Sequence, residues 1–270
     1  MNHRTLVSVA KAAHYFFGLC LVIFLLVPLF AMIPLSFSSG SFLSYPIPEF
    51  SLRWYEEVFS SGPWMSALQN SLIIGVLSTL LATTLGTLAA FALARRNLPA
   101  QRTVLGFLIA PMIIPPVITG LGMYFLFGRM GLTASMHGLV IAHTVLATPF
   151  VVITVTATLQ GFDMRLLQAA NSLGASPFRA FFNVVLPLIL PGVVSGGLFA
   201  FVASFDEIIV TLFLGGPAQR TIPRQMFDGI RDSINPSIIA MSVFLMVVAL
   251  MTLLFSAWLN QRSQKNSIKE

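Results

Sequence analysis

Long apolar runs alternate with short polar segments along the whole chain. A helix needs about 20 apolar residues to cross the hydrocarbon core of a bilayer. Six runs meet this requirement, at residues 15–35, 68–94, 104–127, 139–159, 184–205 and 238–259. The pattern therefore predicts an all-α polytopic membrane protein with six transmembrane helices.

Prolines interrupt two of the six runs. The third contains Pro111, Pro115 and Pro116, and the fifth contains Pro187 and Pro191. Proline removes a backbone donor and bends a helix, although a membrane helix tolerates it when neighbouring groups satisfy the freed carbonyls. We expect kinks at these points.

The composition supports a membrane protein. Of 270 residues, 56% are hydrophobic and 9% are charged, whereas soluble domains carry about 25% charged residues. The net charge of +6 is not gathered into a basic stripe, which argues against nucleic acid as a partner. The lone cysteine, Cys20, rules out an internal disulfide, and no Cys/His cluster suggests a metal site.

The basic residues are distributed unevenly between the two sides that six helices would create. With both termini in the cytoplasm, the inner segments hold ten of the fifteen basic residues, namely Arg4, Lys11, Arg95, Arg96, Arg102, Arg165, Arg179, Arg262, Lys265 and Lys269. The positive-inside rule therefore predicts cytoplasmic termini. The outer side has five basic and seven acidic residues, and this slight negative charge is weakly in favour of a cationic solute.

The polar segment between the fourth and fifth runs predicts two short helices. Asp163 is placed to cap the first helix, and Gly174 to end it in a left-handed turn. Ser176 and Pro177 are typical of the start of a second helix, with serine as its cap and proline at its first position. One interpretation is a helix lying flat on the inner leaflet. The other is a small uncharged surface that enters a groove on a partner protein, which the lack of a basic face favours.

This segment resembles the EAA loop of the inner-membrane permeases of binding-protein-dependent ABC importers. The spacing of that motif is kept throughout, at Gln168, Ala169, Ala170, Gly174, Val184, Leu186 and Pro187. Gln168 stands where glutamate is usual, and Val184 stands where isoleucine is usual. The resemblance implies that residues 161–183 form a coupling loop that docks into a cleft on a cytoplasmic ATPase.

The resemblance also implies the rest of the assembly. A dimer of ATPase subunits would bind ATP, a second permease, more often a paralogue, would complete the pathway, and a periplasmic binding protein would deliver the solute. This chain would hold no cofactor, in line with its lack of a P-loop, since none of its three lysines follows a glycine. The expected location is the bacterial inner membrane.

Further segments are similar to the spermidine/putrescine permease branch, second-permease type, and they lie at residues 67–72, 204–210, 215–217, 221–223, 230–231 and 235–236. The branch also serves opines, phosphonates, iron and amino acids, so the cargo stays open, with a polyamine favoured. Asp206 and Glu207 are candidate pathway residues, because carboxylates at a membrane boundary are costly unless they are wet or paired. An ordinary solvated helix end, with one carboxylate capping or pairing with Arg220 or Arg224, is the alternative.

An ion-coupled secondary transporter and a membrane scaffold are the two alternatives to a permease. An ion-coupled secondary transporter would need charged groups inside its helices, and the clearest ionisable group there is His143, which is more simply a packing histidine. A membrane scaffold would not need the regularly spaced loop. No catalytic motif is present, so we expect no enzyme.

The expected organisation is a first helix with its outer loop (1–66), a core permease domain (67–259) and a cytoplasmic tail (260–270).

Overall fold

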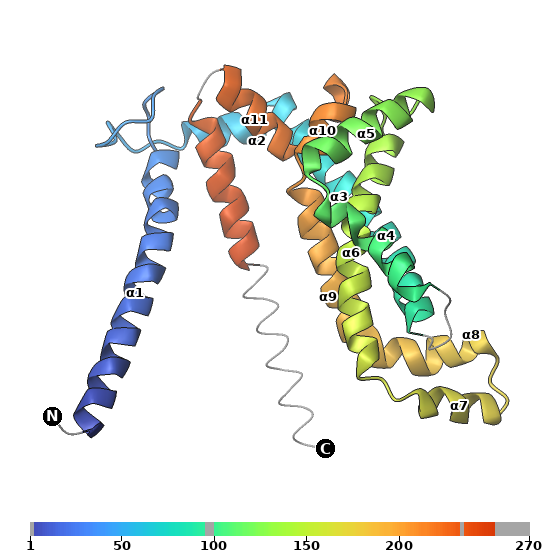
Figure 1. Ribbon diagram of the computed structural model, residues 1–270. Coiled ribbons are helices and arrows are strands. Elements are labelled where there is room, and N and C mark those ends of the chain that lie inside the picture. Colours follow the sequence, from blue (N-terminus) through green and yellow to red (C-terminus); the bar gives the residue numbers. More distant parts are fainter. Residues whose placement is uncertain (1–2, 95–99, 233–234, 252–270) are drawn as a thin grey trace. The chain divides into compact units, whose positions relative to one another are not determined.

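The computed structural model describes residues 3–94, 100–232 and 235–251 of the chain. Its helices are α1 (His3–Ser36), α2 (Arg53–Ser60), α3 (Gly62–Leu93), α4 (Gln101–Ile113), α5 (Pro116–Arg129), α6 (Met136–Gln160), α7 (Met164–Ser172), α8 (Pro177–Ala180), the π turn η1 (Phe181–Val185), α9 (Leu186–Phe205), α10 (Ile209–Leu214), the 3₁₀ turn η2 (Pro217–Gln219) and α11 (Ile222–Asp232) (Figure 1). The chain divides into unit 1, Met1–Met65 with Met226–Glu270, and unit 2, Ser66–Gln225.

Four of the predicted runs correspond to helices that are long and apolar enough to cross a membrane. These spans are Ala13–Ser36, Gly62–Leu93, Met136–Gln160 and Pro177–Phe205. The second span begins several residues before the predicted run, because the polar N-terminal turns of α3 continue the apolar helix outward. The fifth predicted run, at residues 184–205, lies in the last of these four spans, and its helix continues through Pro191, which lies inside α9.

The third run is broken rather than kinked. Helices α4 and α5 meet at an angle of 104° across Ile114 and Pro115. Both residues have extended backbone conformations, with ψ angles of 133° and 131°. A residue that precedes proline is driven out of the helical region, and here Pro115 and Pro116 follow one another. The consecutive prolines therefore divide this run into two short helices that meet at a sharp bend.

Part of the sixth run is described, as a helix over Ser237–Met251. Residues 252–259 of that run and the predicted tail at 260–270 lie outside the described residues, as do Arg95, Arg96, Arg262, Lys265 and Lys269. The described residues thus support four spans, or five when the bent pair is counted as one.

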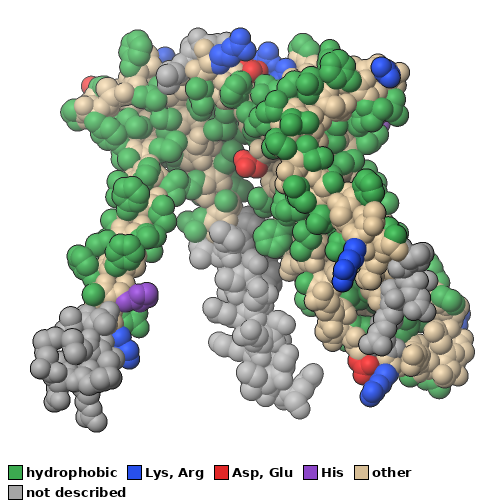
Figure 2. All heavy atoms as spheres, in the orientation of Figure 1, with side chains coloured by type: hydrophobic (Ala, Val, Ile, Leu, Met, Phe, Trp, Pro, Cys, Tyr) green, Lys and Arg blue, Asp and Glu red, His purple; other side chains and the backbone are tan. Residues whose placement is uncertain are grey.

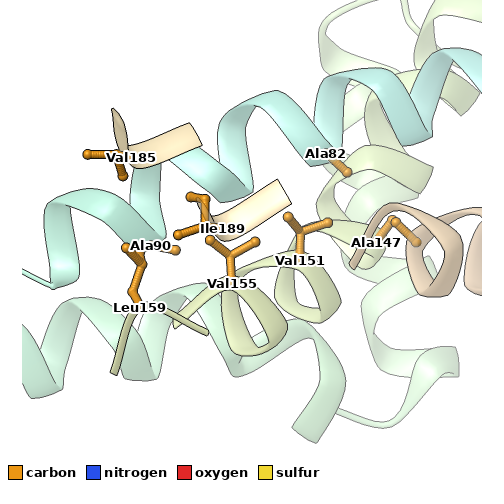
Figure 3. Close-up of a cluster of buried hydrophobic side chains, with 9 residues drawn as sticks. Ala82, Ala90, Ala147, Val151, Val155, Leu159, Val185 and Ile189 are labelled. Atoms are coloured by element: carbon orange, nitrogen blue, oxygen red, sulfur yellow. The ribbon is translucent and has the colours of Figure 1, made fainter. Parts of the chain in front are cut away.

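The core of unit 2 is built from small and β-branched side chains between α3, α6 and α9. Its buried members are Ala82, Ala90, Ala147, Val151, Val155, Leu159, Val185, Ile189 and Ala200 (Figure 3). Alanine and valine let helix backbones approach closely, which is how membrane helices gain packing energy when lipid already satisfies their apolar surface. A second cluster, which includes Ile74, Leu139 and Leu214, joins α3, α6 and α10. These clusters fix the positions of the loops at both ends of the helices.

The tryptophans of unit 1 are enclosed by the protein. Aromatic residues near membrane helices often rest on lipid headgroups, but Trp54 and Trp64 are buried. Tyr55 donates a hydrogen bond from Oη to Ser36 Oγ at 2.8 Å, so it ties α2 to the end of α1. These rings pack inside the protein instead of anchoring it at the surface.

Candidate functional site

The loop between α6 and α9 has the two short helices that the sequence predicts. Asp163 Oδ1 accepts a hydrogen bond from the Arg165 N–H at 2.9 Å and caps α7. At the other end Gly174 has φ +83°, and the N–H of Ala175 bonds to the Ala170 carbonyl at 3.0 Å. This is the Schellman arrangement, in which a left-handed residue satisfies the last carbonyls of a helix. Ser176 then caps α8 by accepting from Arg179 N–H.

The predicted coupling residues lie on an exposed helix. Gln168, Ala169 and Gly174 are exposed, and Ala170 is half-buried. Leu173, at the end of α7, is 89% exposed. Figure 1 shows α7 running across the end of unit 2, and Figure 2 shows acidic and basic side chains beside one another at that end.

The same loop is anchored to the core of unit 2 on its other side. Leu167, Phe181 and Leu186 pack against the buried cluster between α3, α6 and α9. The rings of Phe181 and Phe91 meet edge to face with centroids 5.1 Å apart, which connects the loop to α3. Packed side chains therefore connect the loop to the membrane helices.

Pro187 explains the local geometry at the end of the motif. Because proline has no N–H, the helix cannot complete its regular i to i−4 ladder there. The Leu186 N–H bonds instead to the carbonyl of Phe181, five residues back, which widens the helix into the π turn η1. Such single π turns are rare and occur frequently at functional sites. The Leu-Pro pair thus sets where the loop ends and α9 begins.

The two candidate pathway carboxylates do not share a helix. Helix α9 ends at Phe205, Asp206 is its exposed C-cap residue, and Glu207 follows in the turn before α10. Glu207 Oε1 accepts the Val210 N–H at 2.8 Å, so this carboxylate caps α10. Burial raises the pKa of Glu207, the backbone N–H groups of Val210 and Ile209 lower it, and the charge of Asp206 raises it. Asp206 is therefore exposed, whereas Glu207 is engaged in capping α10.

His143 lies fully buried beside this turn, within a cluster of polar side chains. Its Nδ1 lies 3.1 Å from the carbonyl oxygen and 2.9 Å from Oγ of Ser204, and its Nε2 lies 3.2 Å from Thr211 Oγ1. Ser78 Oγ on α3 lies 2.8 Å from Ser204 Oγ. The expectation of a hydrogen-bonded packing histidine is confirmed. We refer to Ser78, His143, Ser204 and Thr211 as the outer polar cluster.

Asn70 and Ser71 hold a distant loop in place. The sequence indicated them only as part of segment 67–72, through the resemblance to known permeases. Asn70 Nδ2 donates to the carbonyl groups of Ala218 and Arg220, each at 2.9 Å. Ser71 Oγ accepts the N–H of Ile222 at 2.8 Å. The start of the predicted core domain therefore holds the η2 loop. A polar pair at the beginning of an apolar run was the signal that could have indicated this role.

Arg224 closes the other end of α10. Its Nη1 donates to the carbonyl groups of Thr211 at 3.1 Å and Gly215 at 2.7 Å. A cation at the C-terminus of a helix stabilises its unpaired carbonyls. Arg224 therefore has a structural role in addition to any contact with a carboxylate.

Several membrane-length apolar helices and a capped, exposed loop between two of them together define a polytopic helical membrane protein. The family model for the binding-protein-dependent transport system inner membrane component matches residues 82–265. The chain belongs to this family. The resemblance found from the sequence is thus confirmed, the chain is a permease subunit of an ABC importer and not an enzyme, and ion-coupled transport is not favoured.

The similarity to characterised permeases extends over most of the chain. The spermidine/putrescine transport system permease protein PotC of Escherichia coli (strain K12) is 31% identical over 86% of this chain and 88% of its own length. The putrescine transport system permease protein PotI of the same organism is 34% identical over 92% of this chain and 90% of its own length. Both are polyamine permeases by name.

A solved structure confirms the fold. A bacterial ABC transporter involved in the import of the acidic polysaccharide alginate matches with a TM-score of 0.72, covering 96% of this chain and 98% of that chain, at 14% identity. An importer permease of this kind works with ATPase and binding-protein subunits in a bacterial inner membrane.

Proposed function

We propose that this chain is one half of the translocation pathway for a polyamine or a related aliphatic amine. The observation that carries the choice of cargo is the similarity to two polyamine permeases over 86% and 92% of the chain. The exposed carboxylate of Asp206, at the end of a membrane span, supports it, because a solute with ammonium groups gains from a carboxylate that remains hydrated. A periplasmic binding protein delivers the amine, and a second permease, a paralogue of this chain, supplies the other half.

Residues 161–183 are the coupling loop of this permease. Gln168, Ala169, Ala170 and Gly174 form the docking side, and Leu186 with Pro187 sets the point at which the loop joins α9. The exposed surface of α7 supports this assignment, as does the packing of Leu167 against the core. Neutral Gln168 contributes a hydrogen bond where a glutamate would contribute charge. The ATPase dimer binds ATP, and α7 carries its motion to the helices.

Co-purification from mild detergent tests the coupling assignment. The wild type should retain its ATPase, and Ala170→Arg should lose it, because a bulky cation cannot enter a groove shaped for alanine. Arg165→Ala is the matched control, since Arg165 lies on the same helix and is exposed but lies outside the motif. Retention of the ATPase by Ala170→Arg, or an equal loss in Arg165→Ala, would contradict this role of α7.

Uptake of labelled putrescine and spermidine tests the cargo. Expression of the chain with its partner permease, ATPase and binding protein should give ATP-dependent uptake. Asp206→Asn should raise the concentration for half-maximal uptake, because a neutral amide attracts an ammonium group more weakly. Glu207→Gln is the control, since Glu207 is engaged in capping α10. An unchanged half-maximal concentration in Asp206→Asn would remove Asp206 from the pathway.

Six spans complete the proposed topology, with both termini in the cytoplasm and the expected domain boundaries at residues 66 and 259. The helix Ser237–Met251 supports the sixth span, since it is apolar and begins the predicted run. Fusion of a reporter that is active only in the cytoplasm to either terminus should give signal, and insertion of the same reporter after Gly131 should not.

A further inference from the structure

The outer polar cluster lies at the point where α9 ends and α10 begins. Its four side chains are all buried, with His143 at 0% exposure. They come from α3, α6, α9 and α10, which are four elements of unit 2. A buried polar group within apolar helices is costly unless each donor and acceptor is paired. The cluster is therefore a specific connection and not a chance meeting of polar residues.

The partners of His143 determine which ring nitrogen holds the proton. The Ser204 carbonyl only accepts hydrogen bonds, so Nδ1 carries the hydrogen and donates to it. Nε2 then accepts, and the Thr211 hydroxyl hydrogen is shared between Nε2, 3.2 Å from Oγ1, and the Glu207 carbonyl oxygen, 3.4 Å from Oγ1. One neutral imidazole thus makes a bond on each side, and the two bonds have opposite directions. An apolar residue of similar size could fill the space but could not make either bond.

The two partners of His143 are on opposite sides of the Asp206 turn. Ser204 is in the last turn of α9, and Thr211 is in the first turn of α10. Between them the chain has weaker restraints, because the Glu207 N–H reaches the Ser204 carbonyl only at 3.4 Å. The imidazole therefore holds the two sides of the turn at a fixed separation, and this separation sets where Asp206 is presented.

The neighbouring contacts act on one side each or within the turn itself, where the Thr211 hydroxyl also lies 3.4 Å from the Glu207 carbonyl oxygen. Ser78 fixes Ser204 from α3, Arg224 fixes the far end of α10, and Glu207 caps the start of α10. We propose that His143 is a positioning residue, which fixes Asp206 at the entry of the pathway by bonding to both sides of the turn that carries it. The inference rests on the proposed function only for the role of Asp206 in solute passage.

Thiol labelling of the assembled transporter tests this without any solute. Cys20→Ser removes the one natural thiol, and Asp206→Cys then places a reporter in the turn. The reagent is a membrane-impermeant maleimide, and the readout is its rate of reaction. Ala218→Cys is the matched reporter, because Ala218 is also exposed but lies in the loop that Asn70 holds.

His143→Leu should change the labelling rate at position 206 by about three- to tenfold, the factor that loss of one or two hydrogen bonds typically gives. The rate at position 218 should stay within about twofold of its starting value. His143→Asn, whose amide can still donate to Ser204, should restore most of the original rate. Thr211→Val removes the bond to His143 Nε2 and should give an intermediate change in the labelling rate. The test therefore remains decisive if His143→Leu does not fold.

An unchanged rate at position 206 in all three variants would overturn the proposal. So would an equal change at position 218, which would indicate general loosening of unit 2. In the uptake assay, His143→Leu alone should raise the putrescine concentration that gives half-maximal uptake. In a protein that already carries Asp206→Asn, adding His143→Leu should not raise it further. If the wild type takes up no polyamine, the proposed cargo is wrong, while the labelling comparison still decides the role of His143.

Discussion

Replacement of Gly192 by alanine should separate the two helices that flank the coupling loop. Gly192 lies on α9 and faces Thr158 on α6. A methyl group at Gly192 would lie 2.1 Å from Thr158 Oγ1 and 2.8 Å from Thr158 Cβ. Rotation of the threonine side chain can move the hydroxyl but not Cβ, so the clash remains in every rotamer. The helices must therefore move apart at the ends that adjoin residues 161–183.

Overpacking of this kind costs about 1–3 kcal/mol. At roughly 2–4 °C per kcal/mol for a domain of 150–250 residues, the melting temperature of the purified protein should fall by about 2–12 °C. Thermal unfolding in detergent, followed by tryptophan fluorescence, measures this change. Because α6 leads into the coupling loop and α9 leads out of it, ATP hydrolysis by the assembled transporter should also become less dependent on solute.

The control is Gly106→Ala, at a helical position where an added methyl group meets nothing within 4 Å. It should be neutral or slightly stabilising, since alanine favours helix over glycine by up to about 1 kcal/mol. Thr158→Gly, which removes the clashing Cβ, should partly rescue Gly192→Ala. Equal melting temperatures for Gly192→Ala and Gly106→Ala would refute the close approach of α6 and α9 at this point.

Three further predictions concern the two ends of unit 2. Gly174→Ala should cost about 1 kcal/mol because its φ of +83° disfavours a side chain, and the ATPase retained in co-purification should fall about fivefold, while Gly161→Ala, at φ −87°, should have little effect. Asn70→Ala should loosen the two carbonyl groups that it holds, and faster proteolysis of the η2 loop would show this. Burial raises the pKa of Glu207, so wild-type stability should decline as pH rises through that raised pKa. Glu207→Gln should lack this part of the decline when melting temperatures are compared at pH 5 and pH 8.

Much of the coupling loop could be predicted because its signals are local. Asp163, Gly174 and Ser176 act on backbone groups within three or four residues of themselves, so their roles follow from neighbouring residues alone. The roles of Asn70 and His143 could not be predicted in the same way. Their partners are 148 and 61 residues away along the chain, and nothing in one sequence indicates which distant atoms a buried polar group will meet.

The sequence by itself determined the class of protein, the position of most membrane helices and the ends of the coupling helix. Hydrophobic length and capping chemistry are properties of short segments, and the bilayer imposes them directly. Only the tertiary structure decided that the third run is bent by 104° and that Asp206 and Glu207 have separate roles. These outcomes depend on which backbone groups remain unpaired after the helices pack, and packing brings together residues that the sequence keeps far apart.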